Sequence, residues 1–206
     1  MMKKIILIGK GGHSKVIKDI ILEQQRYQLV GYLDNKIDSY YESEGLFYDN
    51  LTNYHKYANK YYFNIAIGNN FVRENIFKEL NIEIERFPTL IHPTASISTS
   101  ATIERGTVVM PNVTINADTK IGHHVIVNSG AVVEHDNMIS DYVHISPNAT
   151  LAGGVMVDLK SHIAIGATVL PQTTIGENCI IGAGATVISD VKTNTTVIGT
   201  PAKPKE

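Results

Sequence analysis

The sequence predicts a small α/β domain followed by a parallel β-helix, and two observations carry this prediction. Residues 1–90 hold nine of the ten tyrosines and 23 of the 38 charged residues, as an ordinary mixed domain would. From Ile91 to Val187 an Ile, Val or Leu recurs at every sixth position, seventeen times in succession. A six-residue period fits neither an α-helix nor an alternating strand, and it is typical of β-solenoids. We therefore expect an α/β domain over residues 1–88 and a β-helix over residues 89–206.

The first residues read as the start of a parallel sheet. Residues 3–8 form a short β-branched run closed by Gly9, which predicts a buried strand. Residues 14–24 place their aliphatic side chains on one helical face, with Ser14 as the expected N-cap. Strands alternating with helices favour a small parallel sheet. The other expected elements are strands at 29–33, 64–67 and 82–87, a helix at 71–80, and a variable loop region at 40–62.

The loops after three of these strands are candidates for a nucleotide site, because ligands of parallel sheets lie beyond the carboxyl ends of the strands. A glycine loop at the start of a helix offers free N–H groups to phosphate. Asp34 follows Gly11 at about the spacing of a ribose-binding acid, although Ser14 replaces the third glycine of that motif. A tight turn without a ligand is therefore the alternative. The expected substrate-binding residues are Gly11, Gly12, His13, Asp34, Asn35, Lys36, Gly68 and Asn69.

In the repeat region, each hexad is expected to form one short strand whose branched residue points inward. Hydrogen bonds then run between successive coils, roughly 4.8 Å apart. Four positions after each branched residue comes a mostly small residue, and Asn137 is the misfit in that series. Cys179 occupies one of these positions, so we expect a buried core thiol. Residues 193–206 are expected to leave the coil and protect one end.

The repeat, I-G-x-x-[A/V/C]-x, resembles that of the hexapeptide acyltransferases, which form left-handed β-helices with three hexads per coil. The chain ending, Val197 to Lys203, resembles theirs as well. Three loop motifs narrow the resemblance to the sugar acetyltransferases of the bacillosamine, perosamine and sialic acid pathways, as does Val133-Glu134-His135-Asp136 with His144 nine residues later. Those loops are Gly9 to His13, Asp34-Asn35-Lys36 and Ile67-Gly68-Asn69-Asn70.

The resemblance implies a homotrimer with active sites between neighbouring helices and acetyl-CoA as the co-substrate. It implies His135 as the catalytic base and Asp136 as the neighbour that raises its basicity, where members commonly carry Glu. It also implies acetyl-CoA contacts at His144 and Gly153. We expect Ala183, further along the coils, to continue that groove.

The residue chemistry agrees with a base at His135. An amine or hydroxyl must lose a proton as it attacks a thioester, and imidazole titrates near neutral pH. A neighbouring carboxylate favours the charged imidazolium and makes the ring a better base. With 18 residues per coil, Gly153 lies one coil beyond His135 and is expected to leave open space there.

The remaining histidines give weaker signals. His55 and His92 are expected to be solvated surface residues. His123 and His124 are adjacent, but no Cys or Glu cluster joins them, so we expect no metal site.

Composition limits the function classes. The net charge of −2 without a basic block argues against nucleic acid or an anionic membrane as the partner. A single cysteine excludes an intramolecular disulfide and favours a cytoplasmic location. No apolar run approaches 18 residues, and the N-terminal run is too short for a signal peptide, so neither a membrane span nor a signal peptide is expected.

The favoured function is transfer of an acetyl group from acetyl-CoA to the amino group of a nucleotide-linked amino-deoxysugar. Two alternatives stay open: O-acetylation of a sugar of the sialic acid type, and a non-catalytic solenoid that binds a nucleotide sugar. A serine acetyltransferase fits less well, because those enzymes carry a helical front domain.

Overall fold

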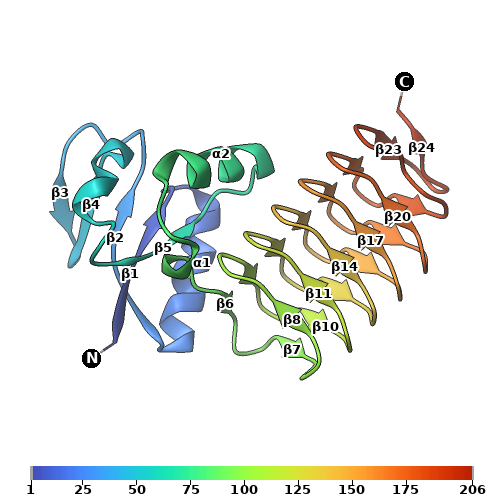
Figure 1. The fold of residues 1–206 in the computed structure, drawn as a ribbon, viewed down its shortest axis with the longest axis horizontal. Coiled ribbons are helices and arrows are strands. Elements are labelled where there is room, and N and C mark those ends of the chain that lie inside the picture. Colours follow the sequence, from blue (N-terminus) through green and yellow to red (C-terminus); the bar gives the residue numbers. More distant parts are fainter. Residues whose placement is uncertain (1, 206) are drawn as a thin grey trace.

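The computed structural model describes residues 2–205, and an α/β front domain lies at one end of a long stack of coils (Figure 1). The front sheet has the order β3-β4-β2-β1-β5, in which only β3 runs antiparallel to its neighbour. Its elements are β1 (Lys3–Ile8), α1 (Gly12–Gln24), β2 (Tyr27–Leu33), β3 (Tyr41–Ser43), β4 (Leu46–Asp49), the 3₁₀ helix η1 (Leu51–Lys56), β5 (Tyr62–Ile65), α2 (Asn70–Leu80) and the 3₁₀ helix η2 (Ile84–Arg86). The predicted fold class, an α/β domain followed by a β-helix, is confirmed.

Three local predictions for the front domain are wrong. Residues 40–62 are not a loop region, because they contain β3, β4 and η1, and stacked rings such as Tyr41 on Tyr48 replace an aliphatic period. The segment 82–87 forms η2 in place of a strand. The N-cap of α1 is Gly11, while Ser14 is buried inside the helix and its hydroxyl donates to the Gly11 carbonyl at 2.7 Å.

The coils form a triangular stack with three faces. Thr114 pairs with Val132 and Ile115 with Val133, which fixes 18 residues per coil. The first face contains β6 (Leu90–Ile91), β9 (Val108–Val109), β12 (Ile126–Val127), β15 (His144–Ile145), β18 (His162–Ile163), β21 (Ile180–Ile181), β23 (Thr196–Ile198) and β24 (Lys203–Pro204). The second face contains β7 (Ser96–Ile97), β10 (Thr114–Ile115), β13 (Val132–Val133), β16 (Thr150–Leu151), β19 (Thr168–Val169) and β22 (Thr186–Val187). The third face contains β8 (Thr102–Ile103), β11 (Lys120–Ile121), β14 (Met138–Ile139), β17 (Met156–Val157) and β20 (Thr174–Ile175).

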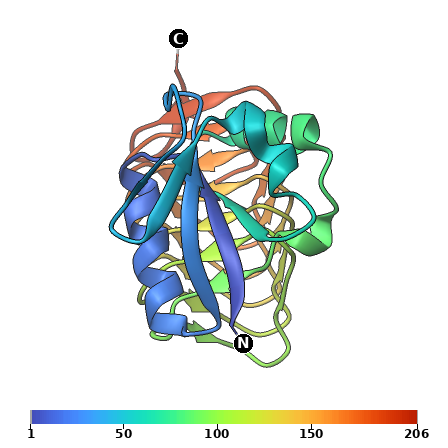
Figure 2. The ribbon, with the colours of Figure 1, turned by 90° about the vertical axis from the view of Figure 1, so that its left-hand side faces the viewer.

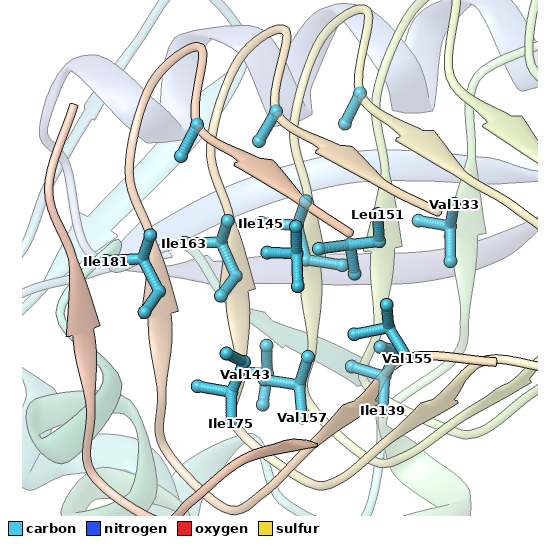
Figure 3. Close-up of a cluster of buried hydrophobic side chains, with 14 of the residues drawn as sticks. Val133, Ile139, Val143, Ile145, Leu151, Val155, Val157, Ile163, Ile175 and Ile181 are labelled. Atoms are coloured by element: carbon cyan, nitrogen blue, oxygen red, sulfur yellow. The ribbon is translucent and has the colours of Figure 1, made fainter. Parts of the chain in front are cut away.

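The hexad residues fill the interior of the coils. Figure 3 shows branched side chains from successive coils, among them Ile145, Ile163 and Ile181, stacked in columns inside the stack. These three are fully buried, and so each contributes about 1.5–3 kcal/mol relative to an exposed position. The expectation that residues 193–206 leave the coil is wrong in part. Strand β23 still pairs in parallel with β21, and only β24 folds back antiparallel onto it.

The front domain packs against the first face at the N-terminal end of the stack (Figures 1 and 2). Ile17, Ile20 and Ile21 of α1 share one apolar cluster with Val108 and Ile126, which point outward from that face. The next outward positions along the face are His144 and His162. The edge of the front domain therefore lies beside two histidines of the coil. Across residues 2–205, no helix has the length and apolar character needed to cross a membrane.

Candidate active site

His135 follows β13 at the corner between the second and third faces. Its Nδ1 lies 2.7 Å from Asp136 Oδ2, and the two side chains are 60% and 64% exposed. Asp136 has a φ of 60°, in the left-handed region that this tight corner requires. The hydrogen bond to Asp136, together with the charges of Asp136 and Glu134, raises the pKa of His135. With Nδ1–H donating to the carboxylate, Nε2 keeps its lone pair for a proton.

Gly153 lies one coil further along, and the space over it is not open. An added Cβ at Gly153 would come within 2.6 Å of both Nε2 and Cε1 of His135, so the imidazole itself occupies that space. The expected gap is therefore corrected: the glycine makes room for the ring. Gly154, rather than Gly153, is the residue with a positive φ, 69°. Gly153 is needed for close approach and not for a left-handed turn.

Asn137, the misfit of the small-residue series, supports the turn that carries His135. Its side chain is fully buried, and Nδ2 donates to the carbonyls of Glu134 at 2.7 Å and Ala152 at 2.9 Å. Thr119 and Ser161 occupy equivalent positions, and each hydroxyl donates to the carbonyl fifteen residues later. Asn137 makes that same contact to Ala152, and its longer side chain adds the bond to Glu134. The sequence marked this position, and the structure supplies the reason.

His144 lies on the first face rather than at the corner that carries His135. Its Nδ1 donates to the Gly68 carbonyl at 3.3 Å, and Nε2 accepts from Asn128 Nδ2 at 3.2 Å. The ring stacks on His162 with centroids 4.9 Å apart, and the His13 ring lies 6.5 Å away. Burial, reinforced by the charges of nearby groups, lowers the pKa of His144 to about 3, so this ring is neutral.

Ala183 does not lie near His135 within one chain. It is exposed in the turn between β21 and β22, at the corner between the first and second faces. His135 occupies the opposite corner of the second face. The expected continuous line from Gly153 to Ala183 is therefore absent from the single chain, because the six-residue period distributes residues over three corners.

The glycine loop and the Asp34 loop meet at the carboxyl edge of the front sheet. The Asp34 carboxylate accepts the backbone N–H of Lys10 at 2.7 Å and that of Lys36 at 2.9 Å. Beside it lies a hollow of about 350 Å³ lined by Lys10, Asp34, Lys36, Ile37, Asp38, Ser39 and Tyr41. The juxtaposition of the two loops follows from the pairing of β1 with β2.

Sequence reasoning missed Lys10 and Tyr41 in this hollow. Lys10 Nζ donates to Tyr41 Oη at 2.7 Å and lies 4.3 Å from the centre of the Tyr48 ring. The place of Lys10 inside the glycine loop was the available signal. Tyr41 gave none, because it lies in the segment expected to be a loop.

The start of α1 is open to solvent. Gly11 and Gly12 have no atom within 4 Å of an added Cβ, and no side chain caps the helix. In contrast, the ring of His13 turns toward the coils; its Nε2 is buried without a hydrogen-bond partner among the described residues, and burial lowers the pKa of His13 to about 4. Asn69 uses its side chain to cap α2, accepting from the Val72 N–H at 3.0 Å.

The other sites expected from sequence are resolved as follows. Cys179 is buried as predicted, and its Sγ donates to the Lys192 carbonyl at 3.0 Å. His92 is buried, contrary to expectation, and pairs with Glu23 at 2.9 Å. Within residues 2–205, no group of three or more His, Cys, Asp or Glu side chains is arranged to hold a metal ion.

Comparisons with known proteins agree with this architecture. Residues 4–80 match the PglD N-terminal domain, and residues 100–135 and 160–189 match the bacterial transferase hexapeptide repeats. Perosamine N-acetyltransferase from Caulobacter crescentus, in complex with CoA and GDP-perosamine, is 32% identical, with a TM-score of 0.89 over 100% of this chain and 99% of that chain. The acetyltransferase domain of PglB from Neisseria gonorrhoeae, in complex with acetyl coenzyme A, is 34% identical, with a TM-score of 0.89 over all of both chains.

A curated relative, UDP-N-acetylbacillosamine N-acetyltransferase of Bacillus subtilis, is 43% identical over 112 residues. The match spans 52% of this chain and about half, 51%, of that protein. The fold and the repeat thus define a hexapeptide-repeat acetyltransferase. More narrowly, the chain belongs to the family of sugar acetyltransferases that join a PglD-type N-terminal domain to a hexapeptide β-helix.

Proposed function

We propose that this protein transfers the acetyl group of acetyl-CoA to the amino group of a nucleotide-linked amino-deoxysugar. The observation that carries the proposal is the His135–Asp136 pair, whose free Nε2 faces Gly153. It sits in a fold shared over the full chain with N-acetyltransferases bound to CoA and GDP-perosamine. An exposed imidazole paired with a carboxylate is a suitable general base.

The proposed reaction needs no covalent enzyme intermediate. The sugar amine attacks the thioester carbonyl carbon while His135 Nε2 takes a proton from the amine nitrogen. Collapse of the tetrahedral intermediate breaks the C–S bond, and the proton on His135 passes to the departing sulfur of CoA. Asp136 holds the ring in the tautomer with Nδ1–H and stabilises the imidazolium that forms.

The front domain is the proposed site for the nucleotide. Asp34 holds the loops of Lys10 and Lys36 together beside a hollow, while Gly11 and Gly12 leave the start of α1 uncovered. Backbone N–H groups at a helix start favour phosphate. We assign the substrate contacts to Gly11, Gly12, His13, Asp34, Asn35, Lys36, Gly68 and Asn69, and those of acetyl-CoA to His144, Gly153 and Ala183.

We further propose that three chains assemble and that their active sites lie between neighbours. The exposure of His135 and the separation of Ala183 from it support this, because a second chain would cover the first residue and bring such a corner closer. We place the domain boundary between residues 88 and 89, between η2 and β6. The proposed use of acetyl-CoA, with Cys179 unpaired and buried, supports a cytoplasmic location.

The test is release of free thiol from acetyl-CoA with a panel of acceptors: nucleotide-linked amino sugars with different bases, the same sugars without an amino group, and sialic acid. Thiol release that requires the amino group, with the N-acetyl product identified by mass spectrometry, supports the proposal. Turnover with hydroxyl acceptors alone would instead establish a sugar O-acetyltransferase. Binding of nucleotide sugars without turnover on any acceptor would indicate a non-catalytic solenoid.

A further inference from the structure

Arg73 of α2 is a fully buried guanidinium without a carboxylate partner among the described residues. It is 1% exposed, and Asn70 and backbone carbonyls accept all of its hydrogen bonds. A buried cation without a counter-ion is costly, and burial lowers the pKa of Arg73 to about 9. A chain retains such a group where its fixed fork of donors holds several acceptors in one geometry.

The acceptors of Arg73 come from three separate parts of the chain. Nε donates to the His124 carbonyl at 2.8 Å, and Nη2 donates to the Tyr142 carbonyl at 2.9 Å, two residues before His144. Nη1 donates to the carbonyls of Ile67 at 3.0 Å and Gly68 at 3.2 Å. One side chain therefore joins the loop after β5 to two successive coils of the β-helix.

The Gly68 carbonyl held by Arg73 is the same atom that accepts from His144 Nδ1. Arg73 thus fixes both sides of that hydrogen bond: the carbonyl of the loop, and the backbone at Tyr142 that leads into the histidine strand. The direction of the bond sets Nδ1–H as the protonated nitrogen and leaves Nε2 as an acceptor.

We propose that Arg73 is a positioning residue that sets the tautomer and placement of His144 by clamping the Gly68 loop onto the coils. The part of this inference that concerns catalysis rests on the proposed function. Through this clamp the front domain, which holds the acceptor, is held in register with the coil that carries the histidine.

Glu74 provides a matched control on the same helix. It is also buried and also docks α2 onto the coils, through Lys160 Nζ at 3.2 Å, but it contacts neither Gly68 nor His144. Glu74→Gln weakens docking without touching the clamp. Arg73→Lys retains the charge and loses the planar fork.

The experiment measures imidazole ¹⁵N chemical shifts, with the His144 signals assigned by their loss in His144→Gln. We expect Arg73→Lys to change the His144 tautomer pattern while the His92 signals stay in place, and Glu74→Gln to leave both unchanged. With the nucleotide amino sugar, kcat/KM should fall at least tenfold in Arg73→Lys and less than twofold in Glu74→Gln. An unchanged His144 pattern in Arg73→Lys, or an equal change in Glu74→Gln, overturns the proposal.

If Arg73→Lys does not fold, Asn70→Ala replaces it, because Asn70 Oδ1 accepts from Arg73 Nη2 at 2.9 Å. The same but smaller change at His144 is then expected, and no change overturns the proposal. The ring signals need no turnover. If the wild-type protein acetylates no sugar, the proposed function fails while the clamp is still decided by the spectra.

Discussion

The imidazole of His135 lies directly against the backbone of Gly153, one coil further along, with 2.6 Å between its Nε2 and the point where a Cβ would stand. Real Cβ atoms do not approach that closely, so any side chain at Gly153 must displace the ring. The proposed base and this glycine therefore form one unit. The five predictions below begin with that unit and end with the buried histidines.

Gly153→Ala should lower kcat at least tenfold by pushing His135 Nε2 out of line, because small misplacements of a catalytic group are costly. The φ of Gly153 is not in the left-handed region, so the fold should tolerate alanine. Steady-state kinetics and thermal melting of the same preparation check this. The matched control is Gly154→Ala, at a φ of 69°, which should cost mainly stability. Wild-type kcat in Gly153→Ala would contradict the contact.

His135→Ala should leave the coils folded, because the side chain is exposed, and should lower turnover by about 10²–10⁴, the usual contribution of a general base. Circular dichroism and acetyl-transfer rates measure the two effects. Turnover equal to wild type with a competent acceptor would remove His135 from the mechanism.

Asp136→Asn should shift the acid limb of the kcat/KM–pH profile to lower pH. The hydrogen bond and charge of Asp136 raise the pKa of His135, so their loss lowers it and the ring stays neutral at lower pH. The weaker base should also reduce the plateau rate. Glu134→Gln is the comparison: its charge acts on His135 from further away, and its carboxylate accepts from Asn116 Nδ2 at 2.9 Å. Its shift should be smaller, and an acid limb unchanged by Asp136→Asn would exclude this role.

Gly12→Ala should raise the KM for the nucleotide sugar while the protein stays as stable or becomes more stable, by up to about 1 kcal/mol. No atom lies within 4 Å of the added methyl group, so the fold does not require glycine there and a ligand must. The KM for acetyl-CoA should not change. A destabilised protein with normal sugar affinity would show that the glycine loop is only a turn.

His124→Leu should make stability less dependent on pH. His124 is fully buried among aromatic rings, and burial lowers its pKa to about 3, against an ordinary value of 6.5. The unfolded chain thus binds a proton between pH 6.5 and about 3 that the folded chain does not, so stability falls as pH decreases through this range. From pH 8 to pH 5, wild type should lose about 2 kcal/mol more than the variant, since one pH unit corresponds to about 1.4 kcal/mol per proton. Urea unfolding at both pH values measures the difference, and equal losses would contradict the prediction.

The sequence alone determined the β-helix and its proposed base. Every sixth side chain of the coil points inward whatever lies elsewhere in the chain, so Ile, Val or Leu at seventeen successive hexads is a local signal. His135 and Asp136 are neighbours in the chain, so their pairing at a corner was readable as well. The segment 40–62 was not, because its strands pack through stacked aromatic rings that follow no simple period.

Only the tertiary structure decided what surrounds the other site residues. His144 receives its partner from Gly68, 76 positions away, and Arg73 finds acceptors 51 and 69 positions away. The hexad period states which residues are inside the coil, and it carries no information about which outward positions a separate domain covers. That choice depends on how α1 and α2 dock on the first face, where apolar burial and the hydrogen-bonding needs of one buried guanidinium are satisfied together.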